Sequence, residues 1–341
     1  MRKRALPSRR LVPIALTVAL FACSSEGEST PVRVPTFPAQ GVWVVVDGSV
    51  LDPDAHPSGV EHIDPNAHRV VGELIGKETV GPNVILEGTR TIAFCHERVW
   101  VAGGELDVID PATHAVETIP LEGRGYAATC GHGSLWLGIL SFAVERYDAS
   151  GTVTRRIDLE GAAPIAMVSS DAAVWVADFQ DRVHRIDGAT NEHKLVPLEF
   201  GGTKFSPRGV AAEGERVWVI GYTSSLVGSH LLGLDDSSGD VTSAVPIDVD
   251  ANLTFVDAVL VEAQGFLWTH GHGGVLKVNP DTGAVHVVEA GGDISDVKVG
   301  FGSVWATDTS ASTTLMIDPA TDEITETIPV GSNPTSLAIS E

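Results

Sequence analysis

Two histidines separated by a single residue, His270 and His272, have the type and spacing that could bind a metal ion. In an extended chain, side chains two residues apart lie on the same face, so both imidazoles could bind one divalent cation. A third ligand would have to come from another part of the chain, and Asp296 and Asp308 are the candidates. The alternative is a pair of histidines hydrogen bonded within a loop. A divalent metal is therefore the one cofactor that the sequence suggests.

Motifs for other kinds of catalysis are absent from the sequence. The segment that starts at Asp248 begins like a calcium loop, but Leu253 stands where the loop needs glycine and Val259 where it needs glutamate. The chain contains no phosphate-binding glycine loop and no Gly-x-Ser-x-Gly nucleophile motif. These absences favour a binding protein over an enzyme.

Cys95 and Cys130 each begin a short turn that precedes a tryptophan, in the segments 95–100 and 130–136. Allowing for one extra turn residue in the second segment, they occupy equivalent positions in adjacent repeats. Cysteines of exported proteins form disulfides in oxidising compartments, provided that their Cα atoms come within ~7 Å. We therefore predict a Cys95–Cys130 disulfide.

The N-terminus has the features of a bacterial lipoprotein leader. Basic residues precede an apolar run over 11–22, which is shorter than the ~20 residues needed to span a bilayer. The run ends in Leu-Phe-Ala-Cys at Cys23, which resembles a lipobox, although Phe21 is bulkier than that motif usually allows. The alternative is an ordinary signal peptide. We expect a leader over 1–22, a polar tether over 23–39, and acylated Cys23 as the only contact with the membrane. The protein would then lie in the bacterial cell envelope and face the periplasm or the outside.

The balance of charge excludes one class of partner. The chain has 45 acidic and 22 basic residues, which gives a formal net charge of −23 at pH 7. Such a surface repels phosphate backbones, so we expect no nucleic-acid partner. We expect a monomer.

Seven tryptophans mark a repeat, and the fold of this repeat would position the candidate histidines and cysteines. Each lies in a short apolar run, such as Val174-Trp175-Val176, and further apolar runs lie before and after it. Units of roughly 40 residues with four short strands predict the blades of a β-propeller, in which the tryptophans fill the space between neighbouring blades. The tryptophans are Trp43, Trp100, Trp136, Trp175, Trp218, Trp268 and Trp305.

Each repeat also has an Asp or Asn at the end of its third strand. Such side chains accept hydrogen bonds from backbone groups two residues further on, which predicts a tight turn into the fourth strand. The residues are Asp64, Asp110, Asp148, Asp187, Asp235, Asn279 and Asp318.

The two ends of the chain complete one blade in this prediction. Residues 36–41 are too few for an inner strand before Trp43, whereas 333–340 form an inner strand that no tryptophan strand follows. We therefore predict an all-β fold over residues 40–341. It is a seven-bladed β-propeller of four-stranded blades, in which the C-terminal strand pairs into blade one and closes the ring.

The last repeat combines Val304-Trp305-Ala306, Ile317-Asp318-Pro319 and a Thr-Ile-Pro-Val-Gly run followed by Asn333-Pro334. This pattern resembles YVTN-type propeller repeats, and the run 174–187 resembles repeats of streptogramin (virginiamycin B) lyases. The resemblance covers about residues 41–341 and implies the fold, but such propellers have many functions. The lyases use a histidine base and a Glu-x-His pair near a magnesium ion. This chain contains no Glu-x-His, so no catalytic residue is carried over.

Propellers bind ligands at the face where each outer strand connects to the next inner strand. Mixed charges with an aromatic ring at this channel mouth would suit a small polar or anionic ligand. The alternative is that these side chains pair with one another and with backbone carbonyls. Two longer loops on the same face are further recognition candidates, or tolerated insertions. The channel-mouth residues are Arg90, Tyr126, Arg208, Asp257 and Asp296, and the loops hold Asp52, Asp54, His56, Tyr222 and His230.

Taken together, these features predict an exported, lipid-anchored propeller that acts as a scaffold for a protein partner or a small ligand. The alternative is a streptogramin-lyase-like or other metal-dependent enzyme acting at the channel mouth.

Overall fold

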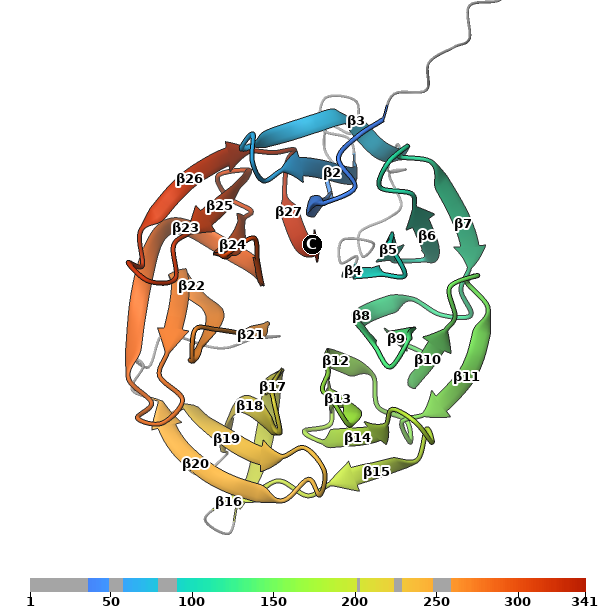
Figure 1. Cartoon of the computed structure of the whole chain (residues 1–341). Coiled ribbons are helices and arrows are strands. Elements are labelled where there is room, and N and C mark those ends of the chain that lie inside the picture. Colours follow the sequence, from blue (N-terminus) through green and yellow to red (C-terminus); the bar gives the residue numbers. More distant parts are fainter. Residues whose placement is uncertain (1–35, 49–57, 79–90, 201–202, 224–228, 248–258) are drawn as a thin grey trace, which may run out of the picture. The chain divides into compact units, whose positions relative to one another are not determined.

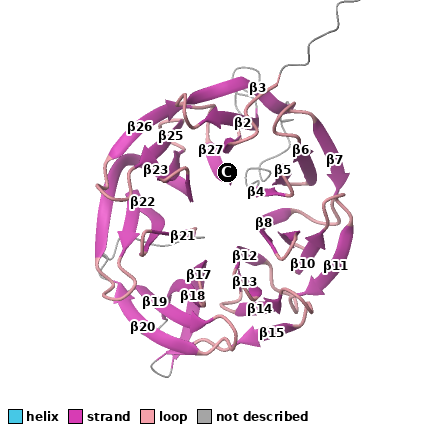
Figure 2. Cartoon of the chain, in the orientation of Figure 1, coloured by secondary structure: helices cyan, strands magenta, loops and turns pink. Residues whose placement is uncertain are grey.

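The computed structural model describes residues 36–48, 58–78, 91–200, 203–223, 229–247 and 259–341, which all belong to one compact unit, Thr36–Glu341. Strands form the regular structure of these residues, and Figure 2 shows no helix among them. The described part of the chain thus has no helix whose length and apolarity would let it cross a lipid bilayer. The all-β prediction is confirmed.

The strands form antiparallel sheets, four of them four-stranded. In sheet order the strands are β27 (Pro334–Ser340), β1 (Gly41–Val46), β2 (Ser58–Asp64) and β3 (Arg69–Glu78); β4 (Thr91–Cys95), β5 (Arg98–Ala102), β6 (Glu105–Ile109) and β7 (Val116–Pro120); β8 (Gly125–Gly131), β9 (Ser134–Ile139), β10 (Ala143–Tyr147) and β11 (Val153–Asp158); β12 (Pro164–Ser169), β13 (Ala173–Asp178), β14 (Val183–Asp187) and β15 (His193–Val196); β16 (Glu199–Phe200), β17 (Thr203–Glu213), β18 (Arg216–Thr223), β19 (Ser229–Asp235) and β20 (Val241–Ile247); and β21 (Leu260–Ala263), β22 (Phe266–Val278), β23 (Val285–Gly300), β24 (Ser303–Asp308), β25 (Thr313–Ile317) and β26 (Ile324–Pro329).

The last of these sheets has six strands because β22 and β23 continue where the repeat predicts a break. The first part of β23 pairs with β22, where Val278 lies opposite Val285, and its second part pairs with β24, where Gly300 lies opposite Ser303. Gly273 in β22 has a φ of 92°, which a residue with a side chain rarely adopts. Glycine lets the chain bend at this point without leaving the sheet.

The tryptophan strand of each repeat is the most deeply buried. Every residue of β1, β9, β13 and β24 is buried, whereas the outer strands β7 and β11 are mostly exposed. Burial on both faces favours continuous apolar runs over alternating ones, which explains sequences such as Val-Trp-Val-Val. Figure 1 shows the inner strands β4, β8, β12, β17, β21 and β27 toward the centre and the outer strands β3, β7, β11, β15, β20 and β26 outside.

All seven tryptophans lie in the core, as predicted. Their exposed fractions are 2% or less. Each indole packs against the tryptophan strand of a neighbouring repeat: Trp43 contacts Val99 and Val101, Trp175 contacts Val217 and Val219, and Trp305 contacts Val42 and Val44. The tryptophans therefore stabilise the contacts between successive sheets.

The predicted turns after the third strands are confirmed. In each of them the Asp or Asn side chain accepts hydrogen bonds from backbone N–H groups two or three residues further on, as Asp110 does from Ala112 and Thr113 at 2.9 Å. These bonds hold the pKa of Asp110 and of Asp187 below the ordinary aspartate value, since they favour the charged carboxylate. The other capped turns follow Asp64, Asp148, Asp187, Asp235, Asn279 and Asp318.

The two ends of the described chain meet at one strand pair. β27 is hydrogen bonded to β1, so that Trp43 lies opposite Ala338. The Ser340 hydroxyl accepts hydrogen bonds from the backbone N–H of Gly41 at 2.8 Å and from Trp43 Nε1 at 3.0 Å. The predicted pairing of the C-terminal strand with the first tryptophan strand is therefore present.

The segment that precedes β1 packs onto the turn after β6. The backbone N–H of Phe37 donates to the carbonyl of Ala112 at 2.9 Å, and the Phe37 ring stacks on His114 at 3.7 Å. His114 Nε2 lies 3.0 Å from His62 Nδ1, and the His62 ring stacks on Trp43 at 3.9 Å. We call Phe37, His114, His62 and Trp43 the histidine stack.

A disulfide joins Cys95 of β4 to Cys130 of β8, with 5.4 Å between their Cα atoms. The prediction from equivalent turn positions is confirmed. The bond links two neighbouring sheets through the ends of their inner strands.

Candidate functional site

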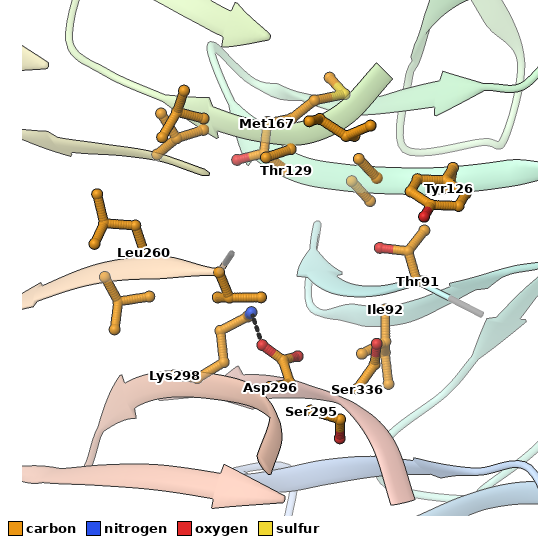
Figure 3. Close-up of a pocket in the computed structure, with 18 of the residues that line it drawn as sticks. Thr91, Ile92, Tyr126, Thr129, Met167, Leu260, Ser295, Asp296, Lys298 and Ser336 are labelled. Carbon is orange, nitrogen blue, oxygen red and sulfur yellow. Dashed lines mark hydrogen bonds and ion pairs between the residues drawn. The ribbon is translucent and has the colours of Figure 1, made fainter. Parts of the chain in front are cut away.

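A cavity of about 360 Å³ lies between the inner strands of the repeats. This volume is within the range that small-molecule sites usually have. Figure 3 shows the side chains around it. The lining comes from β4, β8, β12, β17, β21, β23 and β27: Thr91, Ile92, Tyr126, Ala127, Ala128, Thr129, Ile165, Ala166, Met167, Val168, Val210, Val259, Leu260, Val261, Ser295, Asp296, Lys298, Thr335 and Ser336.

Asp296 and Lys298 are the charged residues of this lining. Lys298 Nζ donates to Asp296 Oδ1 at 2.7 Å, the bond drawn as a dashed line in Figure 3. The same carboxylate accepts from the backbone N–H of Val297 at 2.8 Å and of Leu337 at 2.7 Å. Asp296 is only 4% exposed, so these bonds compensate a buried charge and join β23 to β27.

A second group of side chains extends from the cavity across the next two sheets. The Tyr126 ring, which lines the cavity, meets the Phe179 ring edge-on at 5.5 Å. Asp181, in the same loop as Phe179, lies 3.4 Å from Arg208 Nη1. Arg208 also donates to the Tyr222 hydroxyl and stacks over the Tyr222 ring at 4.7 Å. We call Tyr126, Phe179, Asp181, Arg208 and Tyr222 the rim cluster.

The loop that carries Phe179 and Asp181 is held by hydrogen bonds to a buried carboxylate. Asp178 is fully buried and accepts from the backbone N–H groups of Gln180 at 2.8 Å and Arg182 at 3.0 Å, and from Arg182 Nε at 2.7 Å. His184 Nε2 lies 2.8 Å from the same carboxylate. Burial alone would raise the pKa of Asp178, but the bonds from His184 and Arg182 outweigh it and lower that pKa.

His193 extends this arrangement to the surface. His184 Nδ1 lies 2.8 Å from His193 Nε2, so Asp178, His184 and His193 form one hydrogen-bonded chain. Burial and the neighbouring His184 lower the pKa of His193. The chain fixes the orientation of both rings beneath the rim cluster.

Two residues of the rim cluster, Phe179 and Tyr222, and one further residue, Phe142, are exposed aromatic residues. Phe142 is 48% exposed, Phe179 51% and Tyr222 38%, and they are the exposed aromatic residues of the described chain. All three lie at or just after the end of a tryptophan strand, after β9, after β13 and at the end of β18, in three successive sheets. They therefore lie at corresponding positions on one face.

The structure brings together part of the predicted ligand site. Tyr126 contacts Phe179, and Arg208 pairs with Asp181 of the same loop. Asp296 lies in the cavity wall, where its carboxylate accepts hydrogen bonds from backbone groups. Arg90 and Asp257 lie outside the described residues, as do Asp52, Asp54 and His56 of the first long loop. Cys23 and the leader also lie outside them.

The sequence interpretation missed Phe142, Phe179 and Asp181. A signal was present, since Phe179 and Tyr222 occur four residues after Trp175 and Trp218. An aromatic residue at or beyond the end of a buried strand has no core position to fill. An aromatic residue at this position in two repeats therefore indicates a surface role.

The metal prediction stays a prediction. Within the residues that the structure describes, no three His, Cys, Asp or Glu side chains are placed to hold one metal ion. The Asp308 carboxylate accepts hydrogen bonds from Ser310 Oγ at 2.8 Å and from the Ala311 backbone N–H at 2.9 Å, and these bonds stabilise the loop that follows β24. The side chain of His272 lies outside the described part, so the pairing with His270 is untested.

Neither a protein-family model nor a curated protein sequence matches this chain. Solved structures are similar to it. Hydrazine synthase of Kuenenia stuttgartiensis has a TM-score of 0.63 at 15% identity, covering 78% of this chain and 93% of that chain. A chain of the mitotic checkpoint complex has a TM-score of 0.59 at 13% identity and covers 95% and 93%. BamB of Moraxella catarrhalis has a TM-score of 0.52 at 14% identity and covers 82% and 87%.

These neighbours are β-propeller proteins. The fold is a β-propeller. At such low identities the likeness establishes the propeller architecture and leaves the activity to be argued from the propeller's own residues.

Proposed function

We propose that this propeller is an exported, lipid-anchored scaffold that binds a partner protein through the face bearing Phe142, Phe179 and Tyr222. Large apolar side chains that recur at corresponding exposed positions on one face have no core position to fill, which favours a role in binding. Aromatic rings beside an arginine are typical of the residues that dominate the affinity of protein interfaces. The exposed aromatic rings on three successive sheets are the observation that carries the proposal.

The geometry of the rim cluster supports a preformed binding surface. Arg208 is held by Asp181 and Tyr222, and the loop of Phe179 is held by buried Asp178. Side chains that are fixed before binding lose little conformational entropy when a partner arrives. A partner segment with apolar side chains, and a polar group facing the Arg208–Asp181 pair, would complement this surface.

The scaffold itself is proposed to be seven four-stranded blades in a closed ring, with repeats of the YVTN type. Each of the seven tryptophans packs between repeats, and Trp305 of the last repeat packs on Val42 and Val44 of the first. The pairing of β27 with β1 supports closure, because it places the C-terminal strand inside the first sheet. A ring without free inner edges would give a rigid support for the rim loops.

Export and anchoring belong to the same proposal and rest on the leader sequence and the Cys95–Cys130 disulfide. Disulfides persist outside the cytoplasm, which agrees with export to the cell envelope. Labelling with a palmitate analogue, with Cys23→Ser as the control, tests the anchor directly.

The test of partner binding compares two triple variants of the mature chain. In one, Phe142, Phe179 and Tyr222 become serine; in the matched control, three exposed apolar residues of outer strands, Val116, Val153 and Leu195, become serine. A partner captured from envelope extracts by the wild type and the control, and lost by the rim variant, is then purified.

With the purified partner we expect the rim variant to raise Kd at least tenfold, since truncating a central aromatic contact costs about 2 kcal/mol or more. Equal capture by both triple variants would refute the proposal.

A further inference from the structure

The central cavity has two walls of opposite character (Figure 3). The polar wall comes from β4, β23 and β27, and the apolar wall from β12, β17 and β21. The polar wall presents Thr91, Ser295, Asp296, Lys298 and Ser336; the apolar wall presents Ile165, Met167, Val168, Val210, Leu260 and Val261. A ligand that satisfies both walls must have a polar end and an apolar body.

Lys298 is the charged donor of the polar wall, and its partner Asp296 is also engaged by backbone groups. The Asp296 carboxylate accepts two backbone N–H groups besides Lys298, and these fixed dipoles share in compensating its charge. Among the described residues, Lys298 Nζ bonds to Asp296, and an ammonium group has three donors. With 31% of its side chain exposed, Lys298 keeps donors free toward the cavity.

We propose that the cavity is a binding site for a small amphipathic monocarboxylate. Its carboxylate would accept from Lys298 Nζ and from hydroxyl groups of the polar wall, such as those of Ser336 and Thr91. Its aliphatic or aromatic body would lie against Val168, Val261 and their neighbours on the apolar wall. The site is separate from the rim surface of the proposed function and does not depend on a protein partner.

The composition of the lining argues against other charges on the ligand. The one cation of this wall, Lys298, is already shared with Asp296, so a phosphate with close to two negative charges would leave more charge uncompensated in a partly buried site than a single carboxylate would. A cationic ligand would meet Lys298 itself, while the carboxylate that could attract it is engaged by three donors.

The first experiment uses the wild-type protein and three ligands of equal length: hexanoate, hexanamide and hexylamine, titrated by calorimetry. We expect hexanoate to bind about tenfold or more tightly than hexanamide, because hydrogen bonds to charged groups contribute more than neutral ones. We expect longer monocarboxylates, up to the size limit of the cavity, to bind more tightly as they bury more apolar surface. Hexylamine should bind most weakly.

The second experiment locates the site. Lys298→Gln should weaken hexanoate binding about tenfold or more and leave hexanamide binding nearly unchanged, whereas Lys298→Arg should retain most of the affinity for hexanoate. Val261→Thr keeps the side-chain shape but adds a hydroxyl to the apolar wall, so it should weaken both ligands. Lys194→Gln, on the outer strand β15, makes the same change of charge away from the cavity and should have no effect.

Three results would overturn the assignment. They are hexylamine or hexanamide binding as tightly as hexanoate, hexanoate affinity unaffected by Lys298→Gln, and no heat of binding for any monocarboxylate. The comparison of ligands on the wild type decides the question even where a variant fails to fold. Loss of the rim partner has no bearing on these outcomes, so the two proposals fail independently.

Discussion

The histidine stack makes the stability of this propeller depend on pH through His62. The His62 side chain is 1% exposed, and its burial lowers its pKa from 6.5 to about 4. Burial is the largest contribution to this pKa; the Gln40 carbonyl and Asp64 act in the opposite direction, and the nearby His114 also lowers it. The unfolded chain therefore binds a proton near pH 6.5 that the folded chain binds only near pH 4.

The consequence is a loss of stability on acidification. Above pH 6.5 both states are neutral at His62 and its contribution is fully present; as the pH falls from 6.5 towards 4 the unfolded state gains protons first and is favoured. From these two pKa values the free energy of unfolding should fall by about 2 kcal/mol between pH 7.5 and pH 5 on account of His62 alone. His114, whose pKa is also lowered by burial, adds to this loss.

Urea unfolding followed by tryptophan fluorescence measures this loss at the two pH values. The comparison is between wild type and His62→Gln, which is less stable at pH 7.5 but lacks the titrating ring. We expect the variant to lose about 2 kcal/mol less than the wild type between pH 7.5 and pH 5.

His68→Gln is the matched control, since His68 is exposed and pairs with Glu326 at the surface. It should not reduce the loss of stability as His62→Gln does. If wild type and His62→Gln lost stability in parallel, or if His62 titrated near pH 6.5 by NMR, the reasoning would be refuted.

Other features of the fold lead to further measurable outcomes. Replacing Cys95 and Cys130 by serine opens a loop of sequence separation 35 and should lower the free energy of unfolding by about 4 kcal/mol on the chain-entropy model, with a matching fall in the urea midpoint. Ser340→Ala leaves two buried donors, Gly41 N–H and Trp43 Nε1, without their acceptor and should cost about 2 kcal/mol or more by the same assay; Ser336→Ala on the same strand should cost little. Asp178→Asn should weaken partner binding to the rim more than it weakens hexanoate binding in the cavity. Because the folded-state pKa of Asp178 is lowered, its contribution to stability is lost only as the pH falls below about 4, so the wild type and Asp178→Asn should converge in acid.

The parts of the fold that could be predicted from the sequence are those set by local, repeated patterns. The tryptophan of each second strand and the Asp or Asn of each third-strand turn act within a few residues of themselves, so their roles follow from spacing alone. The Cys95–Cys130 bond followed from the same alignment of repeats, because equivalent positions in neighbouring repeats lie close together.

The candidate site was predicted only in part because it depends on contacts between sheets. Tyr126 and Phe179 lie far apart in the sequence and meet because β8 and the loop after β13 belong to adjacent sheets. Asp296 lines the cavity, and its carboxylate also accepts a hydrogen bond from the backbone of Leu337, a residue of the strand that pairs with the first tryptophan strand. No pattern within one repeat could indicate that bond.

The histidine stack also fixes where a pulling force would enter the molecule. Phe37 is bonded to the turn between β6 and β7, which joins a third strand to a fourth, whereas the rim loops join second strands to third strands. In antiparallel sheets these two kinds of connection lie at opposite ends of the strands. With Cys23 acylated, tension on the lipid would reach the propeller on the end remote from Phe179 and Tyr222. The loops that carry the aromatic rings would then not lie in the path of that tension.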